Sequence, residues 1–157
     1  GAARFLTGTP NVPALYAAMY ESIAAHSRLG FNVVVDVAHH GSYGGDILGD
    51  CARRLAGLPA LFVGVRCPID VIMERRNAGQ PGRIGAYATG TPDEPVPPPV
   101  RLWQEEVHVR GIYDLEVDTS VHTPEECAAL IRARLEEGPP GTAFLRLAAS
   151  LDDGPPQ

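Results

Sequence analysis

Three short apolar segments, each followed by polar or charged residues, dominate the pattern of the chain: residues 31–37, 61–65 and 113–117. The stretches between them carry apolar residues at helical spacing. Valine-rich runs that alternate with helices are typical of parallel strands buried on both faces. The pattern therefore predicts an α/β fold whose ligand binds beyond the carboxyl ends of these strands.

Helical patterns flank the apolar segments. The sequence predicts helices over residues 12–29, 47–55, 68–76, 101–109, 124–136 and 142–150. The fifth has the clearest beginning, because Thr123 and Glu126 are spaced as a capping box. Residues 39–45 form a glycine-rich loop, and the Gly- and Pro-rich residues 77–99 predict a long lid or insert loop.

Length and charge narrow the class of protein. A chain of 157 residues predicts a single domain over residues 1–157, with a frayed tail at residues 151–157. The net charge of -6 disfavours a nucleic-acid-binding surface and a polybasic membrane anchor. No apolar run reaches the roughly twenty residues that a membrane helix needs. We therefore expect neither a nucleic-acid partner nor a membrane partner.

The cysteines and basic residues add two expectations. Cys51, Cys67 and Cys127 are too far apart for a CxxC motif and predict small buried thiols. Their odd number, without a signal peptide, predicts a cytoplasmic protein. All 13 basic residues are arginine, so the chain contains no Walker A lysine. It begins with Gly1, and we expect residues upstream to be missing.

Six segments in order resemble the chloramphenicol 3-O-phosphotransferase-like family of P-loop kinases: VVVDV, LFVGVRCP, ERRNAGQPGR, WQEEVH, YDLEVDTS and TPEECAALI. The resemblance covers about residues 12–137 and is most specific at residues 64–67 and 113–120. It implies a three-layer P-loop kinase-like α/β fold with a mostly parallel sheet. It also implies phosphoryl transfer, with ATP and Mg²⁺, to a hydroxyl of a small acceptor. The family's namesake substrate implies antibiotic resistance.

The departures from the family are equally informative. The family's P-loop strand, its phosphate loop with lysine and its proposed catalytic aspartate would all precede Gly1. Phosphoryl transfer relies on that loop and base, so the 157-residue chain is expected to be inactive and its sheet incomplete at the N-terminus. If that central strand is absent, residues 31–37 and 61–65 should not pair, leaving an unpaired strand edge.

Three candidate residues lie at the end of the first apolar segment and in the loop after it. Asp36 matches an acidic position of the family, which implies a catalytic role in orienting a magnesium-bound water. The alternative is an aspartate that caps the next loop. His39 and His40 are expected to contact the acceptor, or else to pack within the loop. Adjacent residues on an extended chain point to opposite faces, so we expect no metal site there.

Arginines surround the Gly- and Pro-rich turn that follows the helix predicted at residues 68–76. Arg75, Arg76 and Arg83 resemble lid arginines that neutralise charge on a transferred phosphoryl group. The resemblance assigns catalytic roles to Arg76 and Arg83, and nucleotide binding to Arg75. A solvated helix end, where cations complement the helix dipole, is the alternative for Arg75 and Arg76.

The third apolar segment ends in Asp118, Thr119 and Ser120, which the resemblance assigns to nucleotide binding. A simpler and compatible role is to turn the chain toward the next helix. Trp103 and His108 are expected to pack against the lid.

Other function classes stay open on the sequence alone. One is a non-catalytic small-molecule or nucleotide-binding domain without a P-loop, and another is a metal hydrolase built on His39 and His40. The acceptor is not specified by the sequence, and a homo-oligomer is possible.

Overall fold

The computed structural model describes residues 11–79 and 85–152. The chain divides into two compact units. Unit 1 contains the described residues of Gly1–Leu58 and Phe144–Gln157, and unit 2 is Pro59–Ala143. Each unit is described by itself, and the single domain expected over residues 1–157 stays a prediction.

The described residues form six α-helices, one 3₁₀ turn and two strands. Their bounds in chain order are α1 (Val12–Arg28), η2 (Gly41–Tyr43), α2 (Ile47–Leu55), β1 (Val63–Arg66), α3 (Ile69–Ala78), α4 (Pro98–Glu106), β2 (Leu115–Asp118), α5 (Pro124–Glu137) and α6 (Ala143–Asp152). The predicted helices are confirmed, with most bounds within two residues. The exception is α4, which begins three residues before residue 101 because prolines suit its first turn.

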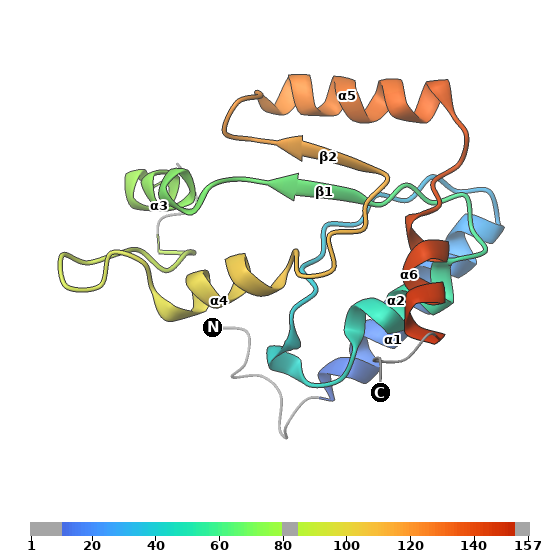
Figure 1. Cartoon of the computed structure of the whole chain (residues 1–157), viewed down its shortest axis with the longest axis horizontal. Coiled ribbons are helices and arrows are strands. Elements are labelled where there is room, and N and C mark those ends of the chain that lie inside the picture. The colour runs from blue at the N-terminus through green and yellow to red at the C-terminus, as the bar shows by residue number, and fades with distance from the viewer. Residues whose placement is uncertain (1–10, 80–84, 153–157) are drawn as a thin grey trace. The chain divides into compact units, whose positions relative to one another are not determined.

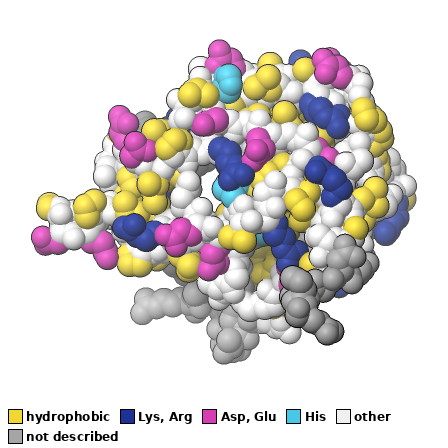
Figure 2. Space-filling model, viewed as in Figure 1, with side chains coloured by type: hydrophobic (Ala, Val, Ile, Leu, Met, Phe, Trp, Pro, Cys, Tyr) yellow, Lys and Arg dark blue, Asp and Glu magenta, His cyan; other side chains and the backbone are white. Residues whose placement is uncertain are grey.

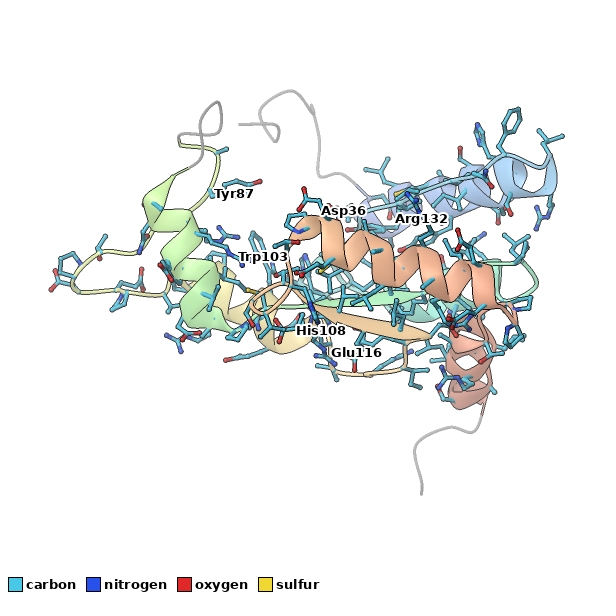
Figure 3. All side chains as sticks on the ribbon, turned by 90° about the horizontal axis from the view of Figure 1, so that it is seen from above. Asp36, Tyr87, Trp103, His108, Glu116 and Arg132 are labelled. Carbon is cyan, nitrogen blue, oxygen red and sulfur yellow. The ribbon has the colours of Figure 1, made fainter. Side chains whose placement is uncertain are left out.

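Unit 2 is built on a parallel pair of strands. β1 pairs with β2 in a register that places Val63 opposite Leu115 and Arg66 opposite Asp118. Figure 1 shows α5 running along β2, and Figure 3 shows the same helix crossing over the two strands. Parallel strands joined through helices confirm the α/β class, and the sheet has two strands in the part of the chain that the structure describes.

The first apolar segment is the main departure from the prediction. Residues 31–37 lie in unit 1 as irregular backbone, and the prediction of a buried strand there is wrong. Val34 is 99% exposed and Phe31 is 61% exposed. A valine-rich run becomes a strand only where a neighbouring strand takes up its backbone hydrogen bonds. The prediction that this run and residues 61–65 do not pair concerns residues of both units, and it stays a prediction.

Each unit has its own apolar core. In unit 1, buried side chains come from α1, α2 and α6: Tyr20, Ala24, Cys51, Ala52, Leu55, Phe144 and Leu147. In unit 2 they come from α3, α4, β2 and α5: Met73, Val100, Val117 and Cys127. Cys51 and Cys127 are buried thiols as predicted, whereas Cys67 is half-buried.

Candidate functional site

A pocket of about 500 Å³ lies in unit 2, next to the residues that follow the two strands. Cys67 comes directly after β1, Thr119 comes directly after β2, and the last turns of α3 complete the wall. Binding pockets for small ligands usually have about 300 to 1,000 Å³ of space. The volume of this pocket therefore suits a molecule of the size of a nucleotide. Its position beyond the carboxyl ends of parallel strands is the one that the sequence predicts.

Arg75 joins α3 to the turn after β2. Its Nη1 donates to Thr119 Oγ1 at 3.1 Å, and its Nη2 donates to the Thr119 carbonyl oxygen at 2.5 Å. Nη1 also lies 3.6 Å from Cys67 Sγ. The structure therefore brings together two of the residues assigned to nucleotide binding, and Arg75 is more than a solvated helix end.

Arg76 is turned toward the loop that follows α3. Its guanidinium lies 5.2 Å from the centroid of the Tyr87 ring, and its Nη1 donates to the Ala88 carbonyl oxygen at 3.3 Å. Asn77 adds a second link, because its Oδ1 accepts from the Gly90 backbone N–H at 3.0 Å. Two neighbouring guanidinium groups line this pocket, which makes its wall attractive to anions such as phosphate.

Asp118 and Ser120 form a local turn. Asp118 Oδ1 accepts from the Ser120 backbone N–H at 2.7 Å and from the Ser120 hydroxyl at 2.6 Å. These hydrogen bonds, the hydroxyl first, lower the pKa of the Asp118 carboxyl. Of the predicted triplet, Thr119 lines the pocket, whereas Asp118 and Ser120 are not among its described lining residues. The turn-forming interpretation of Asp118 is confirmed, and nucleotide binding by the triplet stays a prediction.

The residues predicted near the first apolar segment lie in unit 1. Asp36 is exposed on irregular backbone, and Figure 3 labels it. His39 and His40 are buried: His39 Nε2 lies 2.8 Å from the Tyr20 hydroxyl, and His40 Nδ1 lies 2.5 Å from the Ser42 hydroxyl. Loop packing is therefore confirmed for both histidines, and their contact with an acceptor stays a prediction, as does the catalytic role of Asp36.

Metal chemistry at the histidine pair gains no support. Within residues 11–79 and 85–152, no three His, Cys, Asp or Glu side chains gather in a way that could hold an ion. Arg83, the remaining lid arginine, lies outside the described residues.

A polar network links β1, β2 and the residues just before β2. Arg66 pairs with Glu116, with Nη2 and Oε1 at 2.6 Å, and its guanidinium lies 5.6 Å from the Tyr113 ring centroid. The Tyr113 hydroxyl lies 2.6 Å from His108 Nδ1. Burial, and then the charge of Arg66, lower the pKa of His108. His108 and Glu116 are labelled close to each other in Figure 3. His108 packs edge-on against the Tyr113 ring, and the packing against the lid that was expected for it stays a prediction.

Comparison of the sequence with models of known protein families identifies the family of the chain. A sequence model of the chloramphenicol phosphotransferase-like protein family matches residues 3–136. The chain belongs to this family. Searches among curated proteins and among solved structures gave no match. Membership confirms the resemblance found in the sequence and supports a kinase- or phosphotransferase-like fold.

Sequence reasoning missed several residues of the pocket in this family member. Tyr87, Asn77 and Cys67 line it, and none was a candidate for the site. Cys67 directly follows a predicted strand, and a position just beyond a strand end is a sequence signal for a pocket residue. Tyr87 lies in a Gly- and Pro-rich loop, where neither periodicity nor a family motif marks a single position.

The surface carries charged side chains of both signs. On the face shown in Figure 2, arginine and acidic side chains are interspersed rather than gathered by sign. No described helix is both long enough and apolar enough to cross a membrane. The absence of nucleic-acid and membrane partners stays a prediction.

Proposed function

We propose that this chain forms the nucleotide-binding part of a phosphotransferase that transfers a phosphoryl group from ATP to a hydroxyl of a small molecule. The observation that carries the proposal is the pocket at the strand ends, where Arg75, Arg76 and Thr119 line one wall. Guanidinium groups suit phosphate because they donate two parallel hydrogen bonds to it. The family's namesake makes chloramphenicol the first acceptor to test.

The residues have distinct proposed roles. Arg75 would bind the nucleotide phosphates from a position already fixed by Thr119. Mg²⁺ takes few protein ligands in such enzymes and arrives with the phosphates, and it would shield their charge. Asp36 is the carboxylate that we propose for a water of the magnesium shell. His39 and His40 belong to the loop that we propose for the acceptor side.

A second candidate is a nucleotide-binding domain without catalysis. The 157 residues contain no lysine, whereas P-loop kinases use one to hold the β- and γ-phosphates. Both candidates require ATP to bind, and they differ in turnover.

Binding of Mg·ATP tests the site directly. We expect Arg75→Ala to raise the dissociation constant at least tenfold, because hydrogen bonds to charged groups contribute about 1.5 to 3 kcal/mol. Isothermal titration calorimetry measures it. Arg53→Ala is the matched control, since Arg53 is an exposed arginine near the end of α2 in unit 1.

Arg75→Lys separates charge from structure, because it keeps the cation while losing the paired donors. We expect it to bind ATP more weakly than the wild type and more tightly than Arg75→Ala. Failure of the wild-type chain to bind Mg·ATP would overturn the proposal, and so would equal affinities of the wild type and Arg75→Ala.

A further inference from the structure

Tyr87 is the single aromatic side chain among the described residues that line the pocket. It is 44% exposed, so its ring belongs neither to the core nor wholly to the solvent. Figure 3 shows it on the loop beside the end of α3. An aromatic ring beside arginines, in a pocket of nucleotide size, offers a flat apolar surface next to a phosphate-binding one.

The Tyr87 ring is held in place from α3. The Arg76 guanidinium lies 5.2 Å from its centroid, within the distance at which a cation and a ring attract each other. Arg76 also donates to the carbonyl oxygen of the next residue, Ala88, at 3.3 Å. Asn77 adds a second link, because its Oδ1 accepts a 3.0 Å hydrogen bond from the Gly90 backbone N–H. The loop segment is therefore held at the Tyr87 ring and at two of the three residues that follow it.

We propose that Tyr87 stacks on the base of the bound nucleoside triphosphate, and that Arg76 positions the Tyr87 ring instead of meeting the transferred phosphoryl group. The inference rests on the proposed function and adds a residue that determines affinity for the base. Stacking on an aromatic ring tolerates any base, because every base has a π face. Tyr87 therefore favours nucleotides over phosphates that lack a ring, and Arg75 supplies the contact with phosphate.

The division of labour between the two arginines follows from their contacts. Arg75 points its guanidinium at Thr119, in the turn after β2, whereas Arg76 points its guanidinium at Tyr87 and Ala88, in the loop after α3. Both contacts of Arg76 are made to the loop that carries Tyr87, so its guanidinium fixes the position of the ring. Arg76 thus acts through Tyr87.

The first test measures the dissociation constant of Mg·ATP by calorimetry for the wild type and three variants. We expect Tyr87→Ala to raise it about fivefold to a hundredfold, the range given by stacking of one base. Tyr87→Trp should stay within about threefold of the wild type, because it keeps a stacking surface. Phe31→Ala is the control, since Phe31 is an exposed aromatic residue of unit 1.

The second test is a double-mutant cycle. If Arg76 acts through Tyr87, the double variant Tyr87→Ala/Arg76→Ala binds ATP as tightly as whichever of the two single variants has the lower affinity. If Arg76 contacts phosphate by itself, the two losses multiply, and its positioning role is overturned. Intrinsic fluorescence of Trp103, in unit 2, checks during urea denaturation that every variant is folded.

Two outcomes separate this inference from the proposed function. A wild-type chain that does not bind Mg·ATP overturns the proposed function itself. A wild-type chain that binds, with Tyr87→Ala binding equally well or Tyr87→Trp failing as badly as Tyr87→Ala, overturns only the stacking role. Loss of chloramphenicol binding alone in Tyr87→Ala would assign the ring to the acceptor and overturn the inference as well.

Discussion

His39 shows how burial sets the chemistry of a single side chain. Its ring is 7% exposed, and its Nε2 lies 2.8 Å from the Tyr20 hydroxyl. Burial, followed by the neighbouring His40, lowers the pKa of His39 to about 4. Burial also raises the pKa of Cys51 to about 12 and raises the pKa of Tyr20 still further. The cluster is therefore uncharged at neutral pH.

This environment predicts that acid destabilises unit 1. The unfolded chain binds a proton on His39 below its ordinary pKa of 6.5, whereas the folded ring does so only near 4. Stability is therefore complete above pH 6.5 and is lost as the pH falls toward 4, by at most about 3 kcal/mol. Hydrogen exchange of the α1 amides at pH 7 and pH 4.5 measures the loss. His39→Gln should reduce this pH dependence.

The matched control is His26→Gln, because His26 is an exposed histidine on α1, the helix whose amides are measured. It should keep the pH dependence of the wild type. An identical pH dependence in the wild type and in His39→Gln would contradict the role of His39.

At the same scale, the sequence identified Arg75 and Thr119 because the family motif marks both positions. It could not identify Tyr87, since a residue gains its role in a loop only when other side chains fix that loop. Arg76 and Asn77 do so here, through contacts 11 to 13 residues along the chain. Such contacts leave no local pattern in the sequence.

Among the elements, Asp114 holds together three segments of unit 2. Its Oδ2 accepts from the Phe62 backbone N–H at 2.9 Å, just before β1. Its Oδ1 accepts from the backbone N–H groups of Thr142 and Ala143 at 2.7 and 2.9 Å, where α6 begins. One carboxylate therefore accepts hydrogen bonds from donors at a strand entrance and at a helix start.

We expect Asp114→Ala to destabilise unit 2 by about 3 kcal/mol, because hydrogen bonds to a charged group contribute about 1.5 to 3 kcal/mol each and do not simply add. Urea denaturation followed by Trp103 fluorescence measures it. Asp114→Asn keeps one oxygen acceptor and should lose roughly half as much as Asp114→Ala. A stability of Asp114→Ala equal to that of the wild type would show that water replaces the carboxylate.

Elements were predictable from the sequence where their causes are local. The capping box at Thr123 and Glu126 lies within four residues, and the structure confirms both of its hydrogen bonds, at 3.2 and 2.8 Å. Residues 31–37 failed as a strand because strand formation depends on a neighbour far away in the chain. Their valine-rich composition indicates only what the segment does once a partner strand is present.

At the scale of the whole molecule, the residues proposed for the nucleotide and the acceptor are divided between the two units. Unit 2 carries the pocket with Arg75 and Arg76 in its wall, while unit 1 carries Asp36 and the two buried histidines, His39 and His40. A bound γ-phosphate needs several donors to hold it in line for attack, and P-loop kinases supply a glycine-rich loop and a lysine for this purpose. The 157 residues contain neither a lysine nor a GxxxxGK[ST] sequence.

We therefore expect the 157-residue chain to bind Mg·ATP without transferring its phosphoryl group, because Arg75 in the pocket attracts phosphate, while the 157 residues contain no GxxxxGK[ST] sequence to hold the γ-phosphate for transfer. Transfer of label from [γ-³²P]ATP to chloramphenicol and related alcohols measures turnover, and product should not exceed that of the Arg75→Ala variant. Turnover by the wild type that Arg75→Ala abolishes would contradict this expectation. That result would mean that arginine donors replace the lysine, and that the pocket of unit 2 is itself catalytic.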